Sequence, residues 1–327
     1  MENNTSKPNF LMKIKSFFNN LKNNIVKYWT KAKDYYQRHD TMQLYTLMLP
    51  FLVLFFIFTI LPVGMSLFYS FTNFNMLEKP DFIFLDNYKR LFLEDPVFLT
   101  ALKNTLVLAV ITGPVSYILA FVIAWLINEL PNKLRVLFTL IFYAPSLSGN
   151  AFLIWTLIFS GDSYGYANAI LRYLGIINSP VQWLQDTDYI LWILVIVQLW
   201  LSLGVGFLSF VAGLKGVDKT LYEAGAIDGI RNRWQELWYI TLPQMKPQLL
   251  FGAVTQITSA FSVAAVSIEL CGLPSVDYAG HTIITHLKDY GGVKYEMGYA
   301  SAIATVLFII MILSNQLIQK FIKRVGK

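Results

Sequence analysis

The sequence predicts an all-α integral membrane protein with six transmembrane helices. Of its 327 residues, 55% are hydrophobic and only 14% are charged, and the mean hydropathy is +0.50. A soluble domain carries roughly 25% charged residues, so this composition excludes one. Several apolar stretches also reach the roughly 20 residues that an α-helix needs to cross a hydrocarbon core about 30 Å thick.

These stretches lie at 44–70, 102–128, 134–160, 189–213, 248–271 and 299–319. The third and fifth are the least apolar, and they carry Tyr143, Ser146, Ser148 and Asn150, and Thr255, Gln256, Thr258 and Ser259, respectively. Prolines at 50, 62, 114 and 145 predict kinks, which are tolerated where neighbouring helices satisfy the freed carbonyls. We expect one membrane domain over residues 41–327.

Residues 1–40 precede the first stretch and carry eight Lys and Arg residues interleaved with aromatic and aliphatic ones. This pattern favours a basic amphipathic tail that lies on the inner membrane surface, and it is equally compatible with a disordered tail. A cleaved signal peptide is disfavoured, because the following apolar run is too long and lacks a small-residue cleavage site.

The orientation follows from the positive charges. Nineteen of the 26 Lys and Arg residues lie in the N-terminal tail, at 133 and 135, within 214–247, or in the C-terminal tail. Cytoplasmic loops carry the excess of these residues. Both termini and residues 214–247 are therefore predicted to be cytoplasmic.

Residues 218–247, between the fourth and fifth stretches, form two short helices. Asp218 is a candidate N-cap, and Thr220 precedes Glu223 by three residues as in a capping box. Gly229 ends the first helix as a left-handed cap would. A second amphipathic helix begins near Arg231 and is expected to stop at Leu242-Pro243.

This segment resembles the EAA loop of ABC importer permeases of the carbohydrate-importing subclass. The matching residues are Glu223-Ala224-Gly225-Ala226-Ile227-Asp228-Gly229, Ile240-Thr241-Leu242-Pro243 and Pro247. Gly225 departs from the pattern, where alanine is usual, and should loosen the helix by up to ~1 kcal/mol. The alternative is an ordinary helix-turn-helix connection, or one that reads DNA; its place between two spans disfavours DNA reading.

Residues 87–105 resemble the segment before the second span of sugar permeases, and 298–302 resemble the start of their last span. The chain thus resembles, from about residue 44 to 320, a permease subunit of a bacterial ABC sugar importer of type I, in the maltose and multiple-sugar family. The resemblance implies that the EAA residues couple to an ATPase. They are Glu223, Ala224, Gly225, Asp228, Gly229, Leu242 and Pro243, with Glu223 as the charged contact and Gly229 as the turn.

The resemblance also implies partners: a second permease subunit in a heterodimer, two cytoplasmic ATPase subunits that bind ATP and Mg²⁺, an extracellular solute-binding lipoprotein, a carbohydrate and membrane lipid. It places the chain in the bacterial cytoplasmic membrane, and no nucleic acid is expected. The chain has no G-x-x-x-x-G-K-[ST] motif and no catalytic constellation, so no enzyme activity of its own is expected. Neither a cofactor nor a metal is expected, since His281 and His286 have the wrong spacing for one helix face. The single cysteine, Cys271, excludes a disulfide within the chain.

Polar residues near mid-span define a candidate substrate pathway. Gln198 and Ser202 share one face of the fourth span. Thr255, Ser259 and Ser262 share one face of the fifth, with Thr258 on its flank. Transporters hold substrates near this depth, and these positions match the sugar-contacting helices of the maltose-type permeases by their distance from Glu223. Interhelical packing is the alternative for all six residues.

The acidic residues of the spans narrow the mechanism. Only Glu129 and Glu269 are acidic, and both lie at span ends. A proton-coupled carrier would show carboxylates or histidines at mid-depth, so a secondary transporter or channel for a small polar solute is the second interpretation. A membrane scaffold is the third.

Overall fold

The computed structural model describes residues 40–322, so the basic stretch expected at 1–40 lies, apart from Asp40, outside the described residues. Within them the regular elements are helices, and one isolated antiparallel bridge joins Thr72 and Phe82. The chain forms two compact units that meet at residues 65 and 66. The all-α prediction is confirmed for the described part of the chain.

The first apolar stretch is one long helix made of α2 (Asp40–Phe55), a π-turn η1 (Phe56–Ile60) and α3 (Leu61–Tyr69). Its candidate span runs over Leu44–Tyr69, and none of that hydrophobic window is buried. Pro62 has no N–H to donate one turn back. The helix accommodates this with the wider π-turn, in which the Leu61 amide donates to the carbonyl of Phe56.

The second stretch is the helix α5, which runs over Pro96–Asn128 and starts six residues earlier than predicted. The short helix α4 (Asp86–Lys89) and the π-turn η2 (Arg90–Glu94) lead into it. Asp95 caps α5 by accepting from the Phe98 amide at 3.0 Å, and Pro96 occupies the first turn, where an N–H is not needed. α5 packs against α10 and α14.

The third predicted span is not a continuous helix. α6 (Asn132–Leu147) ends at Ser148, and the 3₁₀ turn η3 (Ala151–Leu153) and α7 (Ile154–Ile158) continue at an angle of 89°. The predicted stretch 134–160 is thus a sharply bent helix pair. The bend follows the proline at 145, where a kink was expected, and lies at Ser148, whose backbone is extended. By length and composition the described residues hold five helices that can each cross a membrane, or up to six spans if this bent pair counts as one.

The fourth and fifth spans are also interrupted. α9 (Thr187–Leu201) and α10 (Val205–Gly216) are separated at Ser202–Gly204, and α14 (Lys246–Phe261) and α15 (Ala265–Cys271) at Ser262–Ala264. Both runs still qualify as spans, Thr187–Gly216 and Lys246–Cys271. The predicted locations are thus confirmed, but each helix breaks close to a serine of the predicted substrate pathway.

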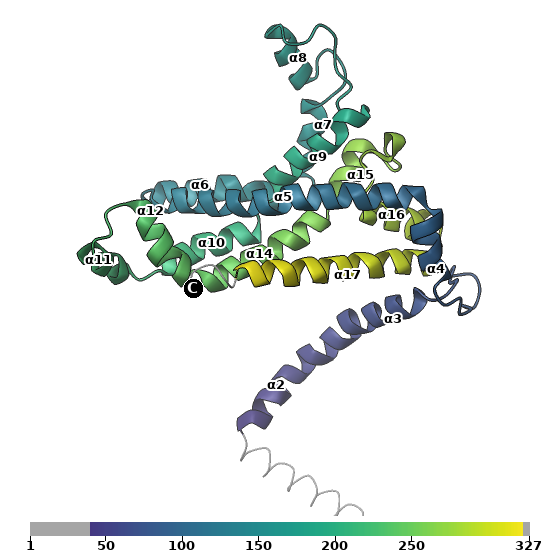
Figure 1. Ribbon diagram of the computed structural model, residues 1–327, viewed down its shortest axis with the longest axis horizontal. Coiled ribbons are helices and arrows are strands. Elements are labelled where there is room, and N and C mark those ends of the chain that lie inside the picture. The colour runs from purple at the N-terminus through teal and green to yellow at the C-terminus, as the bar shows by residue number, and fades with distance from the viewer. Residues whose placement is uncertain (1–39, 323–327) are drawn as a thin grey trace, which may run out of the picture. The chain divides into compact units, whose positions relative to one another are not determined.

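Within the second unit, α5, α10, α14 and α17 (Met297–Ile322) form a bundle (Figure 1). The loop elements α11 (Lys219–Ile227), α12 (Arg233–Glu236), η4 (Leu237–Thr241) and α13 (Leu242–Gln244) follow α10. Figure 1 shows α11 and α12 at one end of α5 and α4 and α16 at the other. The remaining elements are α8 (Tyr166–Tyr173), η5 (Val276–Tyr278), α16 (Ile283–Lys288) and η6 (Asp289–Val293).

Close glycine contacts hold α10 against α14. A Cβ added at Gly252 would lie 2.3 Å from Cζ of Phe210, whose side chain is fully buried. Small residues let transmembrane helices approach this closely. In the halves of the fourth and fifth spans that lie nearer the 218–247 loop, α10 and α14, the Phe210 ring therefore packs directly on the backbone at Gly252.

Gly252→Ala should lower the free energy of unfolding by about 1–3 kcal/mol, because the buried Phe210 ring has no space to move into. Gly113→Ala is the matched control, since the nearest atom to its added Cβ is 3.8 Å away. Thermal unfolding of the detergent-solubilised protein measures both. Equal melting temperatures for the two variants would contradict the packing described here.

Candidate functional site: a central cavity and the EAA-like loop

A cavity of about 590 Å³ lies where the three interrupted spans meet; we call it the central cavity. Its walls come from the bend after α6, the break between α9 and α10, and the break between α14 and α15. All six residues of the predicted pathway line it, namely Gln198, Ser202, Thr255, Thr258, Ser259 and Ser262. The structure thus brings the two predicted helix faces together around one space.

The lining of the central cavity contains no charged side chain among the described residues. Its polar groups are hydroxyls and amides, and Ser146 and Ser148 from the end of α6 add to the predicted set. A charge inside a membrane bundle is costly unless it is paired. The rest of the wall is apolar, so the cavity suits an uncharged ligand with both apolar and hydrogen-bonding surface.

Two glutamines tie the broken spans together. Gln198 Nε2 donates to the Ser259 carbonyl at 3.1 Å and lies 3.3 Å from its Oγ. Gln256 Nε2 donates to the Ser202 carbonyl at 2.9 Å. Both glutamine side chains are buried. Each amide therefore bonds a backbone carbonyl beside the break in the other span, and we call this pair of contacts the amide bridges.

Interhelical packing was the alternative role for the predicted pathway residues. Gln198 has this role, because its amide bonds the fifth span. Gln256 was not in the predicted set, because it lies off the face that Thr255, Ser259 and Ser262 share. The sequence could have indicated its role, because a glutamine within a span must find a hydrogen-bond partner to offset the cost of burying its amide.

Most hydroxyl groups of the cavity donate their hydrogens to carbonyls of their own helices. Thr255 Oγ1 donates to the Gly252 carbonyl at 2.9 Å, and Ser262 Oγ donates to the Thr258 carbonyl at 2.7 Å. Thr258 and Ser202 do the same one turn back. A hydroxyl oxygen keeps its lone pairs when its hydrogen is used. The exposed Thr258 and Ser262 therefore offer acceptors to whatever occupies the cavity.

The first helix of the EAA-like loop, α11, has the caps that the sequence predicts. Asp218 accepts from the Thr220 amide at 3.0 Å, which holds the pKa of Asp218 below its usual value. The Ile230 amide donates to the Gly225 carbonyl at 2.9 Å, with Gly229 at φ +94° between them, which is a Schellman motif. Because Asp218 is the N-cap, Thr220 lies inside α11 and does not form the expected capping box.

The second helix of the loop differs from the prediction. Asn232 caps α12, and the π-turn η4 and then α13 continue the chain through Pro243. The proline therefore begins a helical turn instead of ending the helix, because the first turn needs no proline N–H. The expected stop at Leu242-Pro243 is wrong. Leu242 packs against the apolar cluster that α5, α10 and α14 share.

Gly225 has a packing role that the sequence does not reveal. A Cβ there would lie 2.7 Å from Cδ1 of Ile240 and 3.0 Å from Cδ1 of Ile230. The residue is buried, and α11 contacts η4. Glycine therefore lets the two parts of the loop pack closely, in addition to the lower helix propensity that was expected.

The outer surface of the loop carries both polar and apolar side chains. Glu223, Ala224, Asp228 and Gly229 are exposed, and Ile227 and Trp234 are 88% and 70% exposed. On its other side the loop contacts α5, where Trp125 lies 5.2 Å from Trp234 and Arg233 pairs with Glu129 at 3.2 Å. The loop is thus fixed to the bundle. Four of its predicted coupling residues (Glu223, Ala224, Asp228 and Gly229) face outward, whereas Gly225 is buried and Leu242 packs on the bundle.

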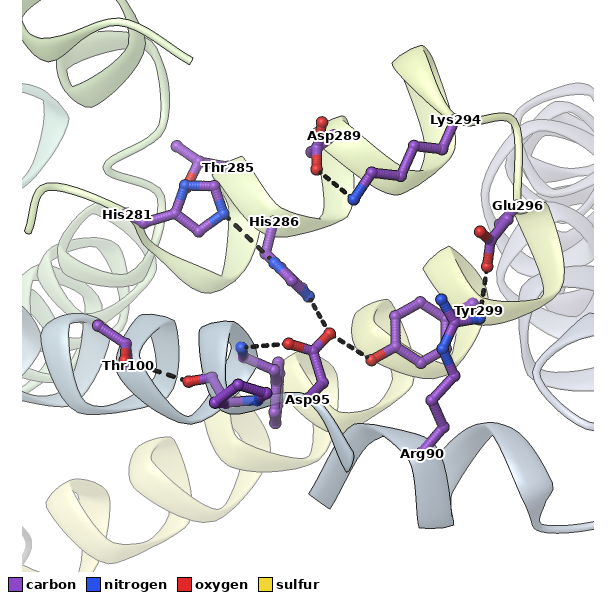
Figure 2. A network of polar contacts seen from close by, with 12 residues as sticks. Arg90, Asp95, Thr100, His281, Thr285, His286, Asp289, Lys294, Glu296 and Tyr299 are labelled. Atoms are coloured by element: carbon purple, nitrogen blue, oxygen red, sulfur yellow. Dashed lines mark hydrogen bonds and ion pairs between the residues drawn. The ribbon is translucent and has the colours of Figure 1, made fainter. Parts of the chain in front are cut away.

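A buried polar network lies at the opposite end of the bundle (Figure 2). Asp95 Oδ2 accepts from the Tyr299 hydroxyl at 2.7 Å and contacts His286 Nε2 at 3.1 Å. His286 Nδ1 lies 3.3 Å from His281 Nε2. Arg90 pairs with Glu296 at 2.5 Å, and its guanidinium lies 4.2 Å from the Tyr299 ring centre. The network fixes the starts of α5 and α17 against α16.

Burial sets the charge state of the histidines. It lowers the pKa of His281 to about 4, and the neighbouring His286 acts in the same direction. Burial also lowers the pKa of His286, against the opposing effect of Asp95. Burial alone would raise the pKa of Asp95, but hydrogen bonds from the Phe98 amide and Tyr299, with the effect of His286, bring it below its usual value. At neutral pH the network therefore holds neutral histidines beside a carboxylate.

These features define a multi-span membrane transport subunit: interrupted spans surround an uncharged cavity, and a two-helix loop lies at one end. Residues 118–327 match the family described as "Binding-protein-dependent transport system inner membrane component", and the chain belongs to this family. Its members are permease components of ABC transporters, and the chain has the type I importer permease fold. The predicted resemblance is confirmed over the secondary-transporter and scaffold interpretations.

Two curated relatives and one solved structure illustrate the similarity. The "Probable ABC transporter permease protein YesP" of Bacillus subtilis (strain 168) is 33% identical over 278 residues, which are 84% of this chain and 88% of the relative. The "Arabinooligosaccharides transport system permease protein AraP" of Halalkalibacterium halodurans is 30% identical over 269 residues, 82% and 83% of the two chains. A chain in the crystal structure of a bacterial alginate ABC transporter, in complex with an alginate pentasaccharide-bound periplasmic protein, superposes with a TM-score of 0.69 at 23% identity and covers 90% of this chain and 98% of that chain.

Acidification should destabilise the fold through the two histidines. Their folded-state pKa values lie below the unfolded value of about 6.5, so the stabilisation is complete above pH 6.5 and is lost as pH falls toward 4. The expected loss is on the order of 2 kcal/mol between pH 7 and pH 4.5. Thermal unfolding at both pH values measures it, with His281→Gln as the variant in which the loss becomes smaller. An identical pH dependence in this variant would contradict the assignment.

Proposed function

We propose that the chain is one of two permease subunits of an ATP-driven importer that carries an oligosaccharide. The observation that carries the proposal is the central cavity, whose largely apolar lining holds neutral hydrogen-bonding groups and no charged side chain among the described residues. A sugar hydroxyl that stays unpaired inside the membrane costs about 1–3 kcal/mol, so a sugar pathway needs many neutral partners. The name of the relative AraP, an arabinooligosaccharides transport system permease, supports the same ligand class.

The proposed assembly contains a second permease subunit, two ATPase subunits that bind ATP and Mg²⁺, and an extracellular solute-binding lipoprotein. The binding-protein-dependent family and the periplasmic protein in the superposed alginate transporter support this composition. The chain would lie in the bacterial cytoplasmic membrane with both termini and residues 214–247 in the cytoplasm, as the distribution of Lys and Arg indicates. The second permease would complete the wall of the central cavity.

Coupling would begin at the exposed face of α11. Glu223 would meet a basic group in a groove of an ATPase subunit, and the exposed Ile227 would enter an apolar part of that groove. The Schellman turn at Gly229 holds α11 at a fixed angle to the rest of the loop. Arg233 and Trp234 contact the end of α5, and Leu242 packs on the cluster shared by α5, α10 and α14. A displacement of α11 would therefore reach the spans that line the central cavity.

The broken spans would convert this displacement into a change of the cavity. The helices α10 and α14 connect the breaks to the EAA-like loop, whereas α9 and α15 lie on the other side of the breaks. A break in a helix allows its two halves to rotate separately. Movement of the loop would therefore change the angle at Ser202 and Ser262 and alter access to the cavity between them.

Replacement of the coupling residues tests the first half of this mechanism. Glu223→Ala removes the charged contact, and Gly229→Arg places a side chain at positive φ and on the docking face. Substrate-stimulated ATP hydrolysis should fall about tenfold, which corresponds to ~1.4 kcal/mol, and less ATPase should co-purify. Glu78→Ala, at an exposed position before α4, is the control. Full stimulation in both loop variants would refute the coupling role.

Uptake of radiolabelled oligosaccharides by proteoliposomes that contain the assembled complex tests the transport function. Ser262→Leu removes an acceptor from the cavity and fills space, and uptake should fall about tenfold, or ~1.4 kcal/mol. Ser314→Leu, on α17 and outside this lining, is the control. If Ser262→Leu leaves uptake unchanged for every sugar, the hydroxyl is a packing group. If the parent complex carries no oligosaccharide, the proposed function is wrong.

A further inference from the structure

A second cavity, of about 420 Å³, lies between α7 with its following loop and the end of α15; we call it the outer cavity. Its polar lining residues are Thr156, Ser160, Gln182 and Gln185, and Phe159 provides an aromatic wall. The chain's single cysteine, Cys271, also lines it. None of these residues belongs to the predicted pathway.

The outer cavity continues the central cavity along the same two walls. On one wall Phe152 lines the central cavity, and Thr156, four residues further on, lines the outer cavity. On the other wall Val266 and Leu270 have the same relation. Four residues of helix rise about 6 Å. Two separate walls thus give the same offset of about one helical turn, which is comparable with the repeat of a sugar chain.

This offset leads away from the EAA-like loop. α15 follows α14, which begins next to that loop at Lys246. The outer cavity therefore lies on the side of the central cavity that is remote from the proposed ATPase contact. A substrate released by a solute-binding protein would meet this side first.

The chemistry of the outer cavity matches that of the central cavity. Its described lining holds no charged side chain. Gln182 Nε2 donates to the Gly161 carbonyl at 3.0 Å, which leaves the Gln182 side-chain oxygen as an acceptor. The side chain of Gln185 is exposed, and its amide group makes no hydrogen bond within the described residues. By contrast, the cavity beside α4 is lined by Asp86, Lys89, Arg90 and Glu296. Neutral amides and hydroxyls therefore distinguish the two cavities in line from the charged one.

Aromatic packing holds the Phe159 ring, which forms the aromatic wall of the outer cavity, in place. Phe159 stacks on Trp155 at 5.6 Å and lies 6.1 Å from Trp183. Sugar rings pack the apolar faces of their C–H groups on such aromatic surfaces. Trp155 itself lines neither cavity, so its contribution is to hold the Phe159 ring.

We propose that the outer cavity is a second sugar subsite, so that an uncharged oligosaccharide occupies the outer and central cavities in line. This inference rests on the proposed import function and narrows its substrate to neutral chains longer than one sugar residue. Acidic glycans and sugar phosphates bring charges that neither lining compensates.

Protection from chemical labelling tests occupancy of the outer cavity directly. A reactive thiol is placed there by Gln185→Cys in a Cys271→Ser chain, and the assembled complex is treated with a membrane-impermeant maleimide. Neutral arabino- and malto-oligosaccharides should slow labelling about fivefold at saturating concentration, whereas arabinose, glucose, alginate oligosaccharides and glycerol 3-phosphate should not. Asp188→Cys in the same background, at an exposed position outside both linings, should show no protection.

Transport kinetics provide the second measurement. Gln182→Leu combined with Gln185→Leu should raise KM about tenfold for the longer neutral chains, leave kcat unchanged, and leave KM for the shortest carried sugar unchanged. A KM that rises equally for all lengths overturns the subsite, and so does labelling that no neutral oligosaccharide slows. If the parent complex carries oligosaccharides and these results are negative, only the subsite is wrong. If the parent complex carries none, the proposed function is wrong and the subsite falls with it.

Discussion

The structure depends on how it pairs backbone carbonyls where its spans break. A bilayer offers no water to these groups, so a helix can be interrupted at membrane depth only if protein groups replace the lost hydrogen bonds. At the two breaks, turn amides supply part of this replacement, since the Ser262 amide donates to the Ser259 carbonyl and the Gly204 amide to the Ser202 carbonyl. Gln198 and Gln256 add a second donor to these same two carbonyls, each from the other span. The amide bridges therefore fix the two breaks against each other beside the cavity. They also make the geometry of the two spans interdependent.

Hydropathy and helical periodicity predicted much of this arrangement. Long apolar runs located the spans, since the length needed to cross a bilayer is a property of local sequence. The shared helix face of Thr255, Ser259 and Ser262 located the cavity, since side chains on one face meet the same space. The break at Ser148 and the passage of the loop helix through Pro243 were not predictable in this way. Both depend on whether distant groups stabilise an interrupted helix, and local sequence does not contain that information.

Glycine and histidine show the same limit. Gly225 departs from the usual alanine, and its reason lies in contacts with Ile230 and Ile240, which are near in space only after the loop has folded. His281 and His286 have a spacing that excludes one helix face. They meet because His281 precedes α16 and its side chain reaches along the helix start. The carboxylate partner of His286, Asp95, is 191 residues away in the chain.

The committed hydroxyl hydrogens of the central cavity have a consequence for selectivity. Because Thr255 and Ser262 donate to their own helices, their oxygens can only receive hydrogens from a guest. These positions can therefore hydrogen-bond the O–H groups of a molecule but not its ether and ring oxygens. A glycan and its fully O-methylated derivative share a ring skeleton, yet only the first presents hydrogens to this wall. At these two positions the wall therefore favours a polyol over the corresponding polyether.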